Sequence, residues 1–167
     1  MDYSTHPANR STYFSLYGRI KIKMKEKILV SACLLGVGCR YDGLSKPNDA
    51  VISLAEDYEL IPFCPEIYGG LPTPRTPSEI VGDRVVMKDG TDVTAQYHRG
   101  AQEALRLCKL LGIKKACLKA KSPSCGTGLV YDGSFSGRLI TGDGVTTSQL
   151  KEASILVFTE DQIDILK

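Results

Sequence analysis

A short apolar run, followed at once by a loop of glycine, cysteine and charged residues, most constrains how this chain folds. The run is Ile28-Leu29-Val30, and the loop that follows it spans Ser31–Gly43. Apolar runs of this kind that end in turn-forming residues are typical of buried β-strands. In open α/β sheets, ligands bind in the crevice at the carboxyl ends of the strands. The stretch therefore predicts a strand whose end carries part of a functional site.

Two later apolar runs also lead into a cysteine. Cys64 follows directly after Glu59–Phe63, and Cys125 follows a few residues after Ile113–Ala120. In the first loop, Cys33 holds the equivalent position. Because parallel strands end at the same edge of a sheet, three strand ends that each carry a thiol predict one convergent site.

Helical patterns separate these runs. One begins at Pro47 and continues to about Tyr58, and a longer one over Asp92–Leu111 places its apolar residues on a single stripe before Gly112. A short helix over 147–153 and a last strand over 155–158 complete the pattern. Strands that alternate with helices predict a single three-layer α/β domain with a mainly parallel sheet and its site at the C-terminal strand ends.

Composition places this domain among ordinary globular proteins. The chain has 167 residues, 43% of them hydrophobic and 24% charged, and a net charge of +2. No run approaches the roughly 18 apolar residues of a transmembrane helix, so we expect no membrane partner. Residues 1–23 show no sustained period, and we expect a flexible N-terminal extension there, with the domain over 24–167.

The six cysteines divide by context. The start of the chain lacks a secretory signal, so we expect a cytoplasmic protein with reduced thiols or metal-ligating cysteines. Cys108 and Cys117 lie inside periodic apolar elements, which indicates core packing. The other cysteines lie in loops among glycine, proline, serine and charged residues: Cys33, Cys39, Cys64 and Cys125.

The spacing of the loop cysteines narrows the choice of site. No C-x-x-C pair is present, which disfavours a zinc ribbon and a thioredoxin-type redox pair. Thiolates that come from separate loops suit an iron–sulfur cluster. Cysteines scattered through the core or over the surface remain the alternative that this pattern leaves open.

Two carboxylates lie near these thiols. Asp42 and Glu66 each follow a loop cysteine by a few residues. A carboxylate in such a place acts as a general acid or base, or it forms an ion pair, here with Arg40 or Arg75. The residues themselves do not separate the two interpretations.

Two loops leave similar alternatives open. Lys121–Gly126 offers hydroxyl and backbone N–H groups in a tight turn, which suits either a polar ligand or local serine caps. The long loop Gly69–Glu79 is either a connector or a wall of the site.

Six motifs in this order resemble one known family. They are Ser31–Gly43, Cys64-Pro65-Glu66, the G-G-L-P-x-P-R run over 69–75, Asp92-Val93-Thr94, Lys119–Gly126 and Asp143–Thr146. Together they resemble the DUF523 family, whose characterised members are thiouracil desulfidases. The resemblance extends over about 25–160.

The resemblance implies a cytoplasmic enzyme with a [4Fe-4S] cluster. By position, it assigns the ligands to Cys33, Cys64 and Cys125. One iron is then left open for the sulfur of a thiocarbonyl, while water replaces that sulfur at carbon. Cys39 remains as a reserve ligand or a sulfur-handling thiol.

The same resemblance implies the roles of the polar residues. Glu66 and Ser124 are the candidates for proton transfer and substrate orientation, with Asp42 next. The implied partner is a small-molecule thiopyrimidine, either 2-thiouracil or a 4-thiouracil nucleotide. The alternative from another class is a non-catalytic iron–sulfur- or zinc-binding sensing module, since a structural zinc site needs four closed ligands and no acid–base groups.

Overall fold

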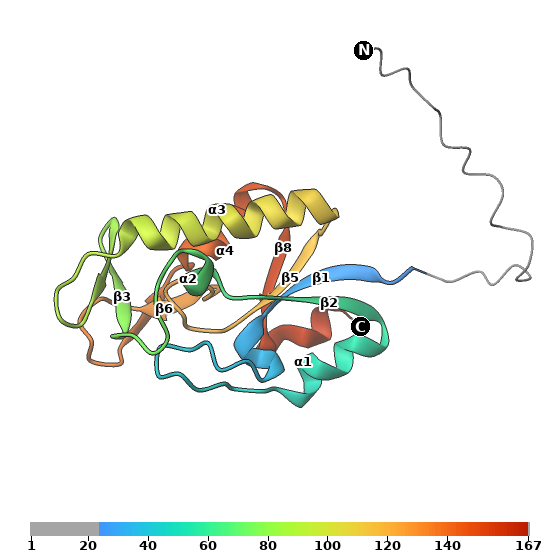
Figure 1. Ribbon diagram of the computed structural model, residues 1–167, viewed down its shortest axis with the longest axis horizontal. Helices are drawn as coiled ribbons and strands as arrows, with labels where there is room; N and C mark the ends of the chain where they lie inside the picture. The colour runs from blue at the N-terminus through green and yellow to red at the C-terminus, as the bar shows by residue number, and fades with distance from the viewer. Residues whose placement is uncertain (1–23, 167) are drawn as a thin grey trace, which may run out of the picture.

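A four-stranded parallel sheet forms the centre of the protein (Figure 1). The computed structural model describes residues 24–166, so the predicted flexible extension over 1–23 lies outside the described residues. The strand order is β2-β1-β5-β8. The strands are β1 (Glu26–Ser31), β2 (Tyr58–Phe63), β5 (Lys115–Leu118) and β8 (Leu156–Thr159). All three pairings are parallel, as predicted.

Helices cover both faces of this sheet (Figure 1). α3 (Thr94–Leu111) and α4 (Val145–Glu152) pack on one face, and α1 (Asp49–Ser53) with the C-terminal 3-10 segment η3 (Glu160–Leu166) packs on the other. Side chains alternate between the two cores, because successive residues of a strand point to opposite faces. The predicted three-layer α/β domain is confirmed.

The side chains of β1 and β5 show this alternation directly. Leu29 packs toward α3, whereas Ile28 and Val30 pack toward α1. The predicted core cysteines follow the same rule: Cys108 lies in the core beneath α3, and Cys117 lies in the core beneath α1. Both thiols are buried, as expected, and burial raises the pKa of Cys108 to about 11 and that of Cys117 to about 12.

Smaller elements surround the sheet: most follow the carboxyl ends of strands, and η2 leads into the start of β2. Two antiparallel hairpins stand apart from the main sheet, and three short helical segments join the strands. The hairpins pair β3 (Ser78–Val81) with β4 (Arg84–Met87) and β6 (Leu129–Tyr131) with β7 (Leu139–Thr141). The short segments are η1 (Ala32–Leu35), η2 (Leu54–Glu56) and α2 (Pro65–Tyr68). Within residues 24–166, no helix has the length and apolar character needed to cross a membrane.

The α-helix expected from Pro47 to about Tyr58 is shorter in the structure, where α1 ends at Ser53. Asn48 caps α1, because its side-chain oxygen accepts a hydrogen bond of 3.0 Å from the backbone N–H of Val51. The chain then tightens into η2 and enters β2 at Tyr58. By contrast, α3 ends where predicted, at Gly112, whose φ of 69° lies in the left-handed region that favours glycine.

Two glycines bring α2 into direct backbone contact with α3. A Cβ at Gly100 of α3 would lie 2.0 Å from the carbonyl oxygen of Pro65, and a Cβ at Gly69 would lie 2.1 Å from that of Gln96. Neither position has room for a side chain, because the obstacle in each case is backbone. The close approach fixes where α2, which carries Glu66, sits beside the sheet edge.

We predict that Gly100→Ala destabilises the fold. In a helix interior this change normally stabilises by about 1 kcal/mol. Here the added methyl group meets the Pro65 backbone, so we expect a net cost of about 1–3 kcal/mol, as for overpacked cores. Thermal unfolding measures the effect. Gln102→Ala, an exposed substitution on the same helix, is the control that should leave the melting temperature near the wild-type value. A higher melting temperature for Gly100→Ala would contradict the close contact.

Candidate functional site

Three adjacent strands bring three of the loop thiols to one edge of the sheet. Cys33 lies in η1 directly after β1, Cys64 follows β2, and Cys125 lies beyond β5. Because Ser31 is in register with Phe63, the segments that carry Cys33 and Cys64 leave the sheet side by side. The structure thus places these thiols at the carboxyl edge, where the sequence predicted a site.

Cys39 joins this group through contacts with two of its members. Hydrogen bonding with the Cys33 thiol, opposed in part by the Cys64 thiol, and burial raise the pKa of Cys39 to about 11. The pKa of Cys64 is raised as well, first by its hydrogen bond with Cys39 and then by burial. The Sγ of Cys64 also donates to the carbonyl oxygen of Cys39 at 3.8 Å. These thiols are therefore immediate neighbours.

Cys125 lies on the other side of Cys64. Burial raises its pKa to about 12, and the charges of Cys64 and Glu66 act in the same direction. Hydrogen bonds with the hydroxyl groups of Ser31 and Ser124 oppose the shift. Cys125 is therefore close to both Cys64 and Glu66, which extends the thiol group across the strand ends.

This donor set fits an iron–sulfur cluster. It consists of soft sulfur donors that come from separate loops, which is how such clusters are held. Cys39, Cys64 and Cys125 have raised thiol pKa values, so they are protonated at neutral pH and would release protons on binding a metal.

The thiols are not arranged as the ligands of a single metal ion. In the described part of the chain, no three or more His, Cys, Asp or Glu side chains converge on one point as ligands of a single metal ion. A cluster spreads its thiolates further apart, because each of them binds a different iron.

The turn before Cys125 is held by a serine cap. The Oγ of Ser122 accepts hydrogen bonds of 3.1 Å from the backbone N–H groups of Ser124 and of Cys125. From α4, the hydroxyl group of Thr147 donates to the carbonyl oxygen of Cys125 at 2.9 Å. The sequence left open whether this turn binds a polar ligand or contains local serine caps. The structure shows a serine cap, which fixes the direction of Cys125.

Ser124 is fully buried. Its hydroxyl group lies 2.9 Å from that of Thr146 in the first turn of α4, and its carbonyl oxygen accepts the backbone N–H of Thr146 at 2.9 Å. A Cβ at Gly144 would lie 2.4 Å from that carbonyl oxygen, so the turn packs directly against the start of α4. The structure places Ser124 next to Cys125 but holds it within the protein.

Glu66 pairs with Arg75. The Nε of Arg75 donates to Oε2 of Glu66 at 2.8 Å, and its Nη2 lies 2.5 Å from the same oxygen. The Arg75 side chain is only 3% exposed and that of Glu66 only 14%. Nη2 also donates to the carbonyl oxygen of Cys39 at 3.1 Å, so the Gly69–Glu79 loop contacts the segment that carries this thiol, which supports the interpretation of the loop as a wall of the site.

Asp42 has only local partners among the described residues. It pairs with Arg40 at 3.0 Å, and its Oδ1 accepts the backbone N–H of Leu44 at 3.0 Å. These contacts shape the tip of the loop after Cys39. Of the two carboxylates predicted near the thiols, the structure brings only Glu66 into their immediate surroundings.

Comparisons with known proteins identify the family to which this chain belongs. The model of the 2-thiouracil desulfurase family matches residues 28–162. YbbK, an uncharacterized protein of Bacillus subtilis, is 41% identical over 150 residues, which cover 83% of this chain and 99% of that protein. A solved structure of TudS, a [4Fe-4S]-dependent thiouracil desulfidase of the DUF523 group, is 51% identical with a TM-score of 0.81 and covers 85% of this chain and 95% of that one.

The chain belongs to the 2-thiouracil desulfurase family. The predicted resemblance to the DUF523 family is therefore confirmed. Which thiols of this family member bind a metal, and which side chains move protons, stay predictions.

The structure adds two residues to the site of this 2-thiouracil desulfurase family member. Ser31 accepts the backbone N–H of Lys119 at 2.9 Å, which ties the ends of β1 and β5 together beneath Cys125. Tyr97 is a buried phenol on α3. Burial raises the pKa of Tyr97 well above its usual value, and the charge of Glu66 adds to the shift. The sequence could have indicated Ser31, because it lies between the strand and Cys33. It gave no indication of Tyr97, whose position in the helical pattern is that of an ordinary core residue.

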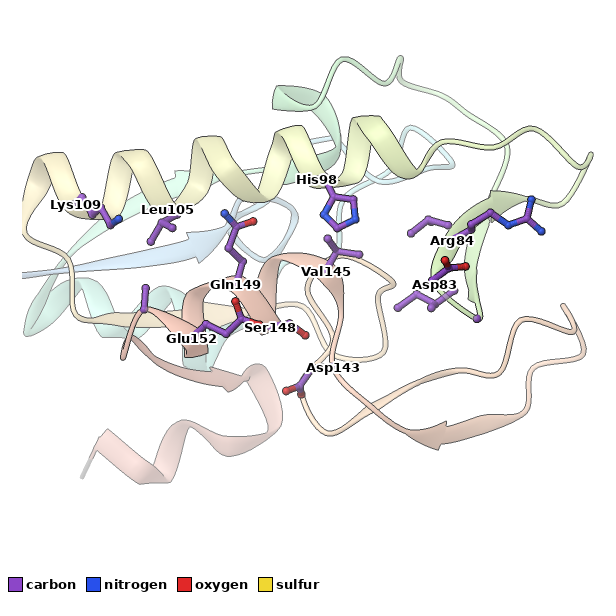
Figure 2. A pocket seen from close by; sticks show the side chains of 14 residues that line it. Asp83, Arg84, His98, Leu105, Lys109, Asp143, Val145, Ser148, Gln149 and Glu152 are labelled. Atoms are coloured by element: carbon purple, nitrogen blue, oxygen red, sulfur yellow. The ribbon is translucent and has the colours of Figure 1, made fainter.

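A separate cleft of about 640 Å³ lies between α3, α4 and the β3–β4 hairpin (Figure 2). His98 points into it from α3 and Gln149 reaches toward it from α4 (Figure 2). Acidic and basic side chains both line it, among them Arg84 and Asp143. None of the candidate site residues lines this cleft, so the thiol site of the family member lies elsewhere.

Proposed function

We propose that this chain is a [4Fe-4S]-dependent desulfidase that replaces the sulfur of a thiopyrimidine by the oxygen of water. One observation carries the proposal: Cys33, Cys39, Cys64 and Cys125 gather at the carboxyl edge of the sheet beside the buried Glu66. Membership of the 2-thiouracil desulfurase family and the likeness to TudS support it.

Cys33, Cys64 and Cys125 are the proposed ligands, one from the end of each of three neighbouring strands. When bound, a cluster supplies a soft Lewis-acidic iron, for which thiocarbonyl sulfur is a suitable ligand. Cys39 is the proposed reserve ligand or sulfur-handling thiol. Because this chemistry needs reduced thiols, we propose a cytoplasmic location.

The net reaction exchanges one sulfur for one oxygen and changes no oxidation state. Water adds to the carbon that carries sulfur, the carbon–sulfur bond breaks, and the products are the oxo base and hydrogen sulfide. Glu66 accepts a proton from the attacking water and returns it to the leaving sulfur or to the ring nitrogen. The hydrogen bonds that the described residues make to this carboxylate end on Oε2, which leaves Oε1 for that proton.

Ser124 and Asp42 complete the proposed machinery. Ser124 orients the substrate, and its bond with Thr146 keeps its hydroxyl group in one direction next to Cys125. Asp42 is the last candidate for proton transfer; its contacts with Arg40 and Leu44 hold it in the loop after Cys39, outside the immediate surroundings of the thiols.

The contacts of Arg75 support the free base, 2-thiouracil, over a nucleotide as the substrate. Arg75 uses its donors on Glu66, on backbone oxygens and on a neighbouring hydroxyl group, and Arg40 pairs with Asp42. The guanidinium of Arg75 is therefore not free to bind a phosphate group, whereas Arg40 contacts Asp42 through Nη2 and remains partly exposed.

An anaerobic assay tests the function. The protein is reconstituted with iron and sulfide and then mixed with 2-thiouracil or with 4-thiouridine monophosphate. We expect loss of thione absorbance and release of hydrosulfide, faster with the free base. Absence of turnover on both compounds, with the cluster absorbance intact, would contradict the proposal and favour a sensing module.

Cysteine variants test the ligand set. Replacing Cys33, Cys64 or Cys125 by Ala should abolish both the cluster absorbance and the activity, because water is a poor substitute for a soft thiolate. Cys108→Ala and Cys117→Ala are the matched controls, and should retain the cluster at a cost of about 0.5–3 kcal/mol of stability.

Cys39→Ala decides between the neighbouring thiols. We expect it to retain the cluster. Loss of the cluster in Cys39→Ala, together with retention in Cys64→Ala, would show that Cys39 is the third ligand. Iron and sulfide analysis of the purified variants gives the result without reference to activity.

Glu66→Gln should separate proton transfer from folding. The amide oxygen can still accept from Arg75, so we expect the fold and the cluster to remain. An amide cannot carry the proton, so kcat should fall by a factor of about 100 or more. Glu103→Gln, which removes a carboxylate of α3 that pairs with the exposed Arg106, is the control. A Glu66→Gln enzyme with wild-type turnover would remove Glu66 from the mechanism.

A further inference from the structure

Arg75 joins the segments that carry the thiols to the segment that carries the proposed base. Its backbone N–H donates to the carbonyl oxygen of Tyr41 at 2.8 Å, and its Nη2 donates to that of Cys39 at 3.1 Å. Nε and Nη2 both contact Oε2 of Glu66. Nη1 donates at 3.1 Å to the carbonyl oxygen of Pro72 and at 3.1 Å to a side-chain oxygen in the same loop. The side chain of Arg75 thus links the loop of Cys39, the helix α2 and its own loop.

The burial of this guanidinium calls for an explanation beyond stability. With 3% of the side chain exposed, Arg75 has lost nearly all of its hydration. Buried ion pairs often add little or nothing to stability, since the desolvation of both charges offsets their attraction. The rigid planar fork of arginine does, however, hold a carboxylate in one orientation, which a lysine ammonium does not.

The contacts are asymmetric on both partners of Arg75. On Glu66, the donors occupy Oε2 and leave Oε1 without a hydrogen bond from the described residues. On Cys39, the carbonyl oxygen accepts both Arg75 and the thiol of Cys64. A Cys64 thiolate has no proton to donate, and the carbonyl oxygen would then keep Arg75 as its donor.

We propose that Arg75 is a positioning residue of this site: it holds Glu66 by Oε2, so that Oε1 faces the substrate, and ties that carboxylate to the loop of Cys39. This inference rests on the proposed desulfidase function and deepens it. Arg75 acts through Glu66 and does not itself touch the reacting atoms.

The test compares Arg75→Lys with a matched control. Arg106 makes the same two-donor contact, with Nε at 2.9 Å and Nη2 at 2.6 Å from Oε2 of Glu103, but it lies exposed on α3. Arg106→Lys therefore loses the same fork away from the site. The turnover number is calculated per bound cluster, which is measured from iron content and absorbance. A variant that binds less cluster or is less stable is then not mistaken for one that is catalytically impaired.

We expect Arg75→Lys to lower kcat per cluster by about 10- to 100-fold with little change in KM, because a small misplacement of a catalytic group is enough for such a loss. Arg106→Lys should match the wild type. An Arg75→Lys enzyme with wild-type kcat per cluster, whatever its stability, overturns the proposal.

A double-mutant cycle separates positioning from a general structural effect. If Arg75 acts through Glu66, then adding Arg75→Lys to Glu66→Gln should lower the residual kcat no further. Additive losses overturn the proposal. A wild-type enzyme without turnover would instead contradict the proposed function. In that case a crystal structure of Arg75→Lys decides, because a Glu66 carboxylate that keeps its place there overturns the inference, and a displaced carboxylate supports it.

Discussion

The parallel pairing of β1 with β2 and with β5 is the constraint on which the site depends. Ser31 is in register with Phe63, and Val30 with Cys117, so the strands reach the edge of the sheet at nearly the same level. The segments that follow these strands all leave the sheet at the same edge, so the thiols that they carry lie close together. Parallel sheets are covered on both faces. The central strands β1 and β5 are accordingly buried over most of their length, whereas the edge strand β2 is mostly half-buried or exposed.

Buried polar contacts convert this meeting of strand ends into a defined geometry. Thr146 and Thr147 of α4 hold the turn that carries Cys125, and Arg75 holds the loop of Cys39 against Glu66. In a low-dielectric interior each of these polar groups needs its partner, which makes the arrangement unique and costly to disturb. Hydrogen bonding with Cys33 and burial raise the pKa of Cys39, and burial raises that of Cys125, so both thiols are protonated at neutral pH and would release their protons on binding a metal.

Much of the fold follows from local patterns in the sequence. Strand β2 differs by a single residue from the expected Glu59–Phe63, and α3 ends at the predicted glycine. Long periodic segments are predictable because burial of one face dictates their composition. The 3-10 segment over 160–166 was not foreseen, since so short an element has no period of its own and forms by packing on the sheet. The pairing of β3 with β4 was not predicted for a related reason, because each of the two strands needs its partner to be stable.

The sequence by itself determined which chemistry the site contains, because a strand, its loop and the thiol within that loop are neighbours along the chain. It identified Cys33, Cys64 and Cys125 as strand-end groups and Glu66 as a nearby carboxylate. Only the tertiary structure decided the partners. Three features depend on contacts between residues far apart in the chain. They are the pairing of Glu66 with one particular arginine, the burial of Ser124, and the position of Cys39 against two other thiols. Those choices are made when packing excludes water, since a buried charge or hydroxyl group must then bind whatever the fold has brought within reach.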